Sequence, residues 1–118
     1  MYRGLYADVA SDDQAAARRR EYEALDHVIG RLKIARESGA AGAGLIDALD
    51  TLEALWLVFI RDVADPENAL PADVRRNVAA IGRWIFATSS RLREEGHGDL
   101  DTLIDVNAAI REGLQAKT

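Results

Sequence analysis

The apolar residues between Leu45 and Ile60 recur at helical spacing. They follow one another in steps of four, three, four and three residues, at Leu45, Leu49, Leu52, Trp56 and Phe59. This spacing places them on one face of an α-helix. Residues 54–60 are apolar without interruption, and a helix that is apolar all round must be covered on several sides. Such a run also fits a buried strand, but the helical spacing before it and the lack of Gly or Pro from 45 to 64 favour a central helix.

A longer amphipathic pattern precedes the central helix, from about residue 12 to residue 37. Asp12 and Asp13 suit the positive end of a helix dipole, and Gly39 suits the left-handed residue that ends a helix. The segment 38–44 contains three glycines and predicts a helix–helix connection. The apolar stripe is narrow, which predicts an outer helix of a bundle, and consists of Tyr22, Leu25, Val28, Ile29 and Leu32.

Residues 1–11 form a short amphipathic segment in front of this helix, with Tyr2, Leu5, Tyr6 and Val9 at helical spacing. A helix of this length is marginal in isolation. We therefore expect a segment separate from the bundle core of residues 12–115. Two interpretations stay open: a disordered start of the chain, or a docking segment for an apolar groove.

A third helix is predicted from Pro71 to Glu95, with Gly96 as its left-handed cap. Pro71 suits the first helical position, because its missing N–H needs no partner there. Asn68 is expected to hold the preceding loop by hydrogen bonds to the backbone. The apolar stripe consists of Val74, Val78, Ile81 and Ile85, with Trp84 alongside.

The fourth helix opens at Asp99, a residue type favoured at helix N-caps. Asn107 stands in the middle of its apolar stripe, and we expect one buried hydrogen bond from Asn107 to fix the register of this helix. The stripe itself consists of Leu100, Leu103, Ile104, Ile110 and Leu114.

These patterns predict one all-α domain over residues 1–118, a small bundle of about four helices with antiparallel neighbours. A hydrophobic share of 48% and a charged share of 30% are typical of a globular protein. No apolar run approaches the roughly 20 residues of a membrane-spanning helix. The first residues lack the apolar core of a secretory signal, so a cytoplasmic location without a membrane is expected.

The net charge of −5 argues against direct binding of nucleic acid, which favours a basic surface. The one basic triplet, Arg18-Arg19-Arg20, lies on a predicted helix whose consecutive side chains point in different directions. The chain has no cysteine, which excludes disulfides and thiolate ligands.

The residues offer little for catalysis, a cofactor or a metal. His27 and His97 stand on different elements, and neither has a second histidine at the spacing of a helical zinc site. Ser89 and Ser90 have no base nearby in sequence, and we expect them on an exposed part of the third helix. The sequence predicts a non-enzymatic binding protein whose aromatic anchors are Trp56 and Trp84, unless each serves only core packing.

Three motifs stand out together: Ala48-Leu49…Leu55-Trp56, Asn68-Ala69-Leu70-Pro71 with Arg75, and Leu103-Ile104-Asp105-Val106-Asn107…Ile110…Glu112-Gly113-Leu114. In these motifs the chain resembles FlaF, the flagellar biosynthesis regulator of alphaproteobacteria. The resemblance extends from Tyr6 to Leu114. One departure is Leu52, where the family usually has Asn. We expect structural roles for Asn68, Leu70, Pro71, Asn107 and Gly113.

The resemblance implies a cytoplasmic protein that binds flagellin as a secretion chaperone. Together with FlbT, such a protein positively regulates flagellin synthesis and export. An amphipathic flagellin helix would lie in an apolar groove beside the central helix. The expected groove residues are Leu52, Leu55, Trp56, Phe59, Val78 and Trp84, with Tyr2, Leu5 and Tyr6 as a cover in the absence of a partner.

Two other functions remain open from the sequence. The chain could be an adaptor that binds only FlbT and controls flagellin mRNA translation indirectly. It could also regulate that mRNA by direct contact, against which its acidic charge argues.

Overall fold

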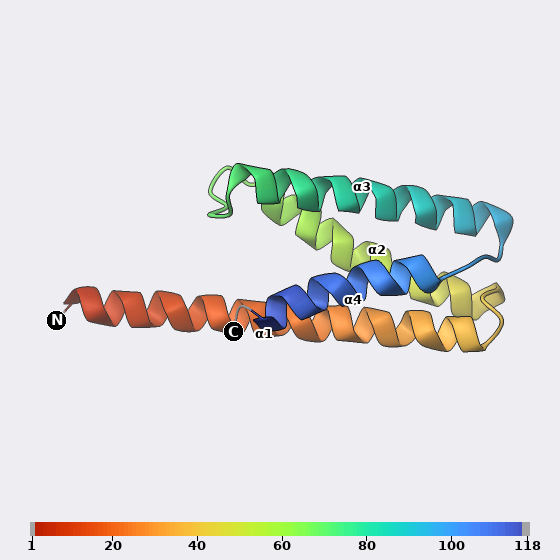
Figure 1. Ribbon diagram of the computed structural model, residues 1–118, viewed down its shortest axis with the longest axis horizontal. Helices are drawn as coiled ribbons and strands as arrows, with labels where there is room; N and C mark the ends of the chain where they lie inside the picture. Colours follow the sequence, from red (N-terminus) through yellow and green to blue (C-terminus); the bar gives the residue numbers. More distant parts are fainter. Residues whose placement is uncertain (1, 117–118) are drawn as a thin grey trace.

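The computed structural model describes the backbone of residues 2–116 and the side chains of residues 14–114. It contains four helices, α1 (Tyr2–Glu37), α2 (Gly42–Ala64), α3 (Ala72–Glu95) and α4 (Asp101–Ala116) (Figure 1). The described residues form no strand, and their one β-bridge joins Ala41 to His97, in the loops before α2 and before α4. The prediction of a small all-α bundle is confirmed.

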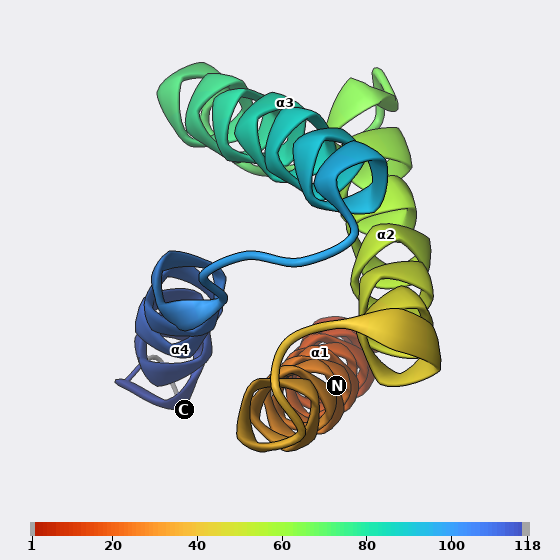
Figure 2. The same cartoon turned by 90° about the vertical axis from the view of Figure 1, so that its right-hand side faces the viewer.

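The helices pack in the spatial order α3, α2, α1, α4, which differs from their order in the chain. Each is antiparallel to the next in this series (Figure 1). After α3, the chain crosses to the other side of the molecule, and α4 packs along α1 (Figure 2). The series therefore stays open between α3 and α4 instead of closing into a ring of four. The molecule is elongated, with extents of 58 × 24 × 19 Å.

The start of α1 differs from the sequence prediction. The helix runs without a break from Tyr2, so residues 2–11 belong to it and are not a separate segment. No proline interrupts this stretch, and strong helix formers such as Ala and Arg carry the helix past Asp12 and Asp13. The predicted cover by Tyr2, Leu5 and Tyr6 concerns side chains that lie outside the described residues.

The C-terminal end of α1 follows the prediction. Gly39 has a φ of 95°, and its N–H donates to the carbonyl of Arg36. The N–H of Ala40 donates to the carbonyl of Ala35 at 2.8 Å. These two bonds make a Schellman motif that satisfies the last carbonyls of α1. The glycine-rich connection is shorter than expected, since α2 begins at Gly42.

The loop before α3 is held by Asn68, as predicted. Its side-chain amide donates to the carbonyl of Asp62 at 2.9 Å, and its Oδ1 accepts the N–H of Leu70 at 3.0 Å. Pro71 stands one residue earlier than predicted: it is the N-cap of α3, and its carbonyl accepts the N–H of Arg75.

The ends on either side of the α3–α4 connection also follow the sequence. Gly96 is the left-handed cap of α3, with a φ of 76°. The carboxylate of Asp99 accepts the N–H of Asp101 at 2.8 Å and so caps the start of α4, although the helix itself begins two residues later than Asp99.

The core lies where α1, α2 and α4 meet, and α3 joins it through its C-terminal half. Of the predicted α3 stripe, Ile85 is fully buried, but Val74, Val78 and Ile81 are only partly buried. Among the described residues, α4 packs on α1 and does not cover these three residues in the N-terminal half of α3. Within the described residues, no helix is both long and apolar enough to cross a membrane.

Candidate protein-binding surface

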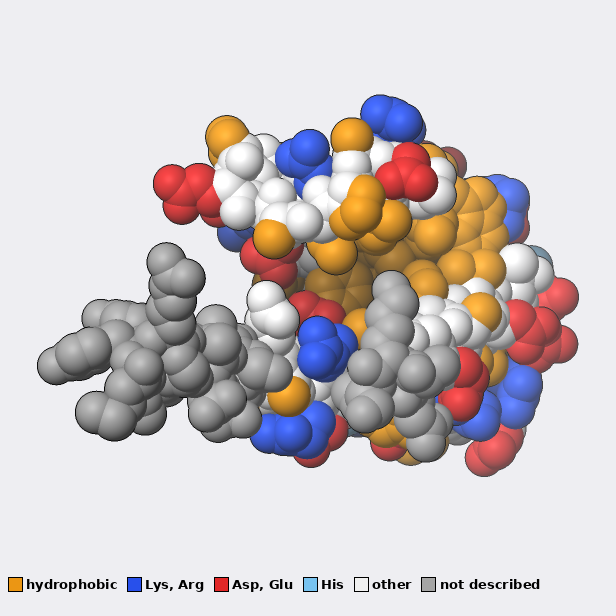
Figure 3. Space-filling view, turned by 60° about the vertical axis from the view of Figure 1, so that its left-hand side comes forward, with side chains coloured by type: hydrophobic (Ala, Val, Ile, Leu, Met, Phe, Trp, Pro, Cys, Tyr) orange, Lys and Arg blue, Asp and Glu red, His pale blue; other side chains and the backbone are white. Residues whose placement is uncertain are grey.

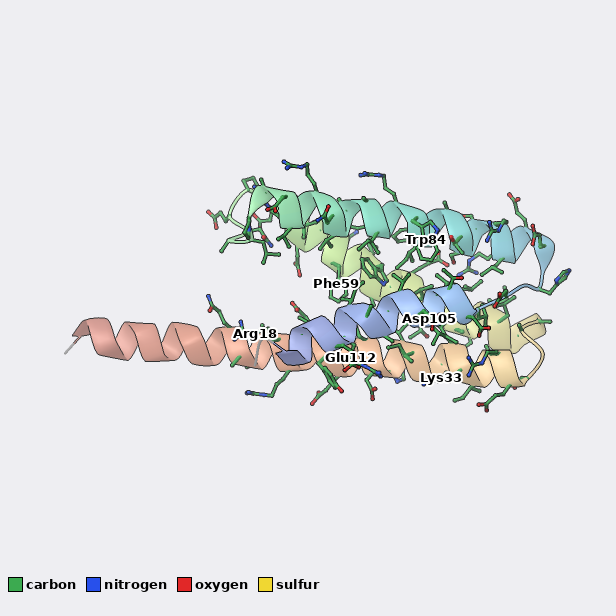
Figure 4. The ribbon with its side chains drawn as sticks, in the orientation of Figure 1. Arg18, Lys33, Phe59, Trp84, Asp105 and Glu112 are labelled. Atoms are coloured by element: carbon green, nitrogen blue, oxygen red, sulfur yellow. The ribbon has the colours of Figure 1, made fainter. Side chains whose placement is uncertain are left out.

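An apolar hollow opens between α3 and the helices below it (Figure 3). We call this surface the open groove and define it by Phe59 of α2, Val78, Ile81 and Trp84 of α3, and Ile110 of α4. Phe59, Val78, Ile81 and Ile110 are partly buried against the core, whereas Trp84 is 37% exposed. Phe59 and Trp84 both lie in the space between α3 and α4 in Figure 4.

Trp56 lies in the core next to Phe59 of the open groove and is only 1% exposed. The indole Nε1 of Trp56 donates to Oδ1 of Asn107 on α4 at 2.8 Å. The amide of Asn107 in turn donates to the carbonyl of Leu103 at 2.7 Å. The ring of Phe59 meets that of Trp56 edge to face, with 5.2 Å between their centroids. The predicted buried hydrogen bond of Asn107 is therefore confirmed, and its partner is Trp56.

Two predicted docking residues belong to the core instead. Trp56 and Leu52 are buried at 1% and 0% exposure, so a partner cannot contact either while the bundle stays closed. The hydrogen bond to Asn107 allows Trp56 to be buried, since a buried indole N–H needs an acceptor. Leu55 is partly buried against the same core. The candidates that retain exposed surface in the open groove are Phe59, Val78 and Trp84.

A polar cluster joins the C-terminal half of α3 to α2. The hydroxyl of Ser89 donates to Oε2 of Glu53 at 2.7 Å, and Nε of Arg93 donates to the same oxygen at 2.9 Å. Hydrogen bonds to Asp50, and then to Glu53, raise the pKa of the Arg93 guanidinium. The sequence prediction of an exposed Ser89 was wrong, because this residue turns towards α2 and is completely buried. A substrate therefore has no access to its hydroxyl.

Ion pairs fasten α4 to α1 near both ends of their contact. Arg36 pairs with Asp101 at 3.0 Å, and Arg111 pairs with Asp26 at 2.7 Å. The Arg111 guanidinium also lies 5.9 Å from the centroid of the Tyr22 ring. Exposed pairs of this kind contribute about 0–1 kcal/mol each, so they orient α4 more than they stabilise it.

A second concave site lies between the end of α2 and the start of α3. This pocket of about 340 Å³ has walls of aliphatic side chains and two arginines. We call it the hairpin pocket; its lining is Ile60, Val63, Ala64, Ala72, Arg75, Arg76 and Ala79. It shares no residue with the open groove.

The titratable groups of the described part form no cluster that could hold a metal ion. His27 and His97 are both exposed. Glu21 of α1 is half-buried, and its pKa is raised, first by loss of solvation and then by repulsion from Asp62 of α2. The geometry offers surfaces on which a protein partner could bind.

The sequence matches the family model described as flagellar protein FlaF over residues 2–114, almost the whole chain. The chain belongs to the FlaF family. No curated protein and no solved structure gives a significant match. Family membership makes this a flagellum-related protein.

The FlaF motifs take different places in the structure. Asn68 and Pro71 build the α2–α3 loop, and Leu70 is joined to them through its backbone N–H, with 42% of its surface exposed. Asn107 is in the core. Gly113 lies exposed in α4 with open space around the position of a Cβ, so packing within the described residues does not require glycine there.

Sequence reasoning missed the hairpin pocket and the buried side chain of Ser89. Helical spacing contains no signal that Arg75 lines a pocket, because the pocket forms only where α2 and α3 meet. The spacing of Ser89 from Ile85 and Leu92 could have indicated burial, since steps of four and three residues lie on one helix face.

Proposed function

We propose that this FlaF-family protein binds flagellin as a cytoplasmic secretion chaperone, and that it promotes flagellin synthesis and export together with FlbT. In this proposal an amphipathic helix of flagellin lies in the open groove. The protein shields the apolar face of that helix until export. No catalysis and no cofactor take part.

The observation that carries the proposal is the open side of the helix series. Val78 and Ile81 of α3 and Phe59 of α2 are only partly buried against the core, and within the described chain α3 packs on α2 while α4 packs on α1. An additional amphipathic helix bound between α3 and α4 would bury these residues. Such helices insert apolar side chains at i, i+3, i+4 and i+7, which matches a groove lined by helices.

Trp84 provides the sharpest test of the open groove, because it is exposed and does not support the core. We expect flagellin from the same organism to bind the purified protein saturably, measured by calorimetry. Trp84→Gln should raise the Kd about tenfold or more, as expected for an aromatic anchor. Ile34→Gln is the matched control, since Ile34 is 59% exposed on α1 and stands outside the groove.

Circular dichroism should show that both variants keep the helical content of the parent protein. An equal Kd for Trp84→Gln and the parent would contradict the open groove as the binding site. If flagellin does not bind at tens of micromolar but FlbT does, the adaptor function replaces the chaperone function.

A further inference from the structure

The hairpin pocket combines apolar walls with positive charge. Ile60, Val63 and Ala79 supply aliphatic surface from both helices, and Arg75 and Arg76 stand on the first turns of α3. Its volume of about 340 Å³ is at the lower end of the ~300–1,000 Å³ range of ligand pockets. It can hold one or two side chains of a partner.

The α2–α3 loop determines where Arg75 lies. The two hydrogen bonds of Asn68 close the loop, and Pro71 fixes the first backbone bond of α3 by accepting the N–H of Arg75. Arg75 is thereby held one turn into the helix, against the end of α2. The loop thus presents a guanidinium at a defined position.

The arginines of the hairpin pocket lack acidic partners within the described residues. Acidic side chains pair there with Arg31, Arg36, Arg93 and Arg111, but with neither Arg75 nor Arg76. The Nε–H of Arg75 is moreover buried without a hydrogen bond among those residues. A buried donor without an acceptor destabilises the folded protein, and more so when it carries charge. A ligand that supplies an acceptor would remove this destabilisation.

We propose that the hairpin pocket binds an acidic amphipathic peptide segment of a partner protein. An aliphatic side chain of that segment enters between Val63 and Ala79, and a neighbouring carboxylate pairs with Arg75 and Arg76. Carboxylates suit guanidinium groups because two parallel N–H···O bonds form at once. Inorganic phosphate would leave the apolar walls unused, and a neutral helix would leave the arginines unpaired. If the segment belongs to flagellin, the pocket is a second contact of the proposed chaperone.

The chemistry of the pocket can be tested with two peptides and ¹⁵N NMR. The acidic probe is acetyl-Ala-Leu-Glu-Leu-Glu-amide, and the neutral probe replaces both Glu by Gln. We expect saturable shifts at the backbone amides of Val63, Ala72 and Ala79 with the acidic probe. The neutral probe should bind roughly fivefold more weakly or worse, because it lacks the charge-assisted hydrogen bonds.

Variants on α3 assign the effect to the two arginines. Arg75→Gln/Arg76→Gln should remove the preference for the acidic peptide. Arg76→Gln alone should reduce it and keep the fold, since Arg76 is exposed. Arg91→Gln, near the C-terminal end of α3 and outside the pocket lining, is the control and should leave binding unchanged. Equal binding of both peptides, or shifts at Phe59 and Trp84 instead, would overturn the proposal.

Flagellin itself separates this inference from the proposed function. If flagellin binds the parent and the double arginine variant equally, the pocket is not a flagellin contact and the open groove stands alone. If the acidic peptide binds in the pocket while flagellin does not bind at all, the chaperone function fails and the pocket serves another acidic partner. Weaker flagellin binding by the double variant, with a smaller salt dependence, supports both the chaperone function and the hairpin pocket as a flagellin contact.

Discussion

Trp56 and Asn107 determine how α4 meets α2. Their side chains form the buried hydrogen bond between these helices, and both are at most 1% exposed. Asn107 also bonds the carbonyl of Leu103, so its amide has partners on both its oxygen and its nitrogen. A satisfied polar pair of this kind costs little when intact and much when one member is removed.

We expect Asn107→Ala to lower the free energy of unfolding by about 2–3 kcal/mol, because it leaves the Trp56 N–H unpaired in the core and removes packed atoms. Urea unfolding followed by circular dichroism measures this change. Asn77→Ala, at an exposed position on α3, should change stability by less than about 0.5 kcal/mol. Equal effects of the two substitutions would show that the hydrogen bond contributes nothing to stability.

The contact of α2 with α3 depends on Gly82. A Cβ built at this position would lie 2.6 Å from Cδ1 and 2.7 Å from Cγ1 of Ile60, and 3.6 Å from Cε3 of Trp56. Glycine therefore lets the two helices approach closely at this point. Gly30 of α1 offers a contrast, since nothing lies within 4 Å of its Cβ position.

Substitution by alanine should change the free energy of unfolding with opposite signs at Gly30 and Gly82. Gly30→Ala should stabilise the protein by about 0.5–1 kcal/mol through helix propensity. Gly82→Ala gains the same propensity, but overpacking against Ile60 costs about 1–3 kcal/mol, so we expect a net loss. Urea unfolding of both variants provides the measurement, with Gly82→Ala/Ile60→Val expected to recover part of the loss. Stabilisation by Gly82→Ala alone would mean that Ile60 moves aside freely.

The spatial order of the helices matters for the molecule as a whole. α1 and α2 form the middle of the series, α3 packs on α2, and α4 packs on α1 (Figure 2). The open groove is the apolar hollow beside α3 in Figure 3. The same order places Glu21 of α1 near Asp62 in the last turn of α2, where Asp62 also accepts the side-chain amide of Asn68 from the α2–α3 loop.

Glu21 should make stability depend on pH. Its pKa is raised above 4.5 by burial and by Asp62, so the folded state binds this proton more tightly than the unfolded state. This group therefore increases the free energy of unfolding as the pH falls through its folded pKa, and decreases it as the pH rises. Glu21→Gln should raise the thermal midpoint relative to the parent at pH 7 and give little difference at pH 4. The exposed Glu23→Gln is the control; a pH-independent effect of Glu21→Gln would contradict this assignment.

The sequence by itself determined the helices, several of their ends and one buried polar residue. These features depend on local rules: apolar spacing, Gly39 and Gly96 at left-handed positions, and the hydrogen bonding of Asn68 and Asp99. Asn107 could be predicted because an amide in an apolar stripe needs a partner wherever the helix packs. The start of α1 was misplaced because a helix can continue through weak capping residues when nothing breaks it.

The tertiary structure alone decided which side of each helix stays uncovered. Short connections favour packing between consecutive helices, yet α4 packs on α1 and not on α3. No local pattern in the sequence encodes this choice of neighbour. That packing buries Trp56 against Asn107 of α4, whereas Trp84 stays exposed at the edge of the open groove. Helical spacing indicates which residues face inward, but exposure depends on the neighbouring helix, and neighbours are set by the packing of the whole chain.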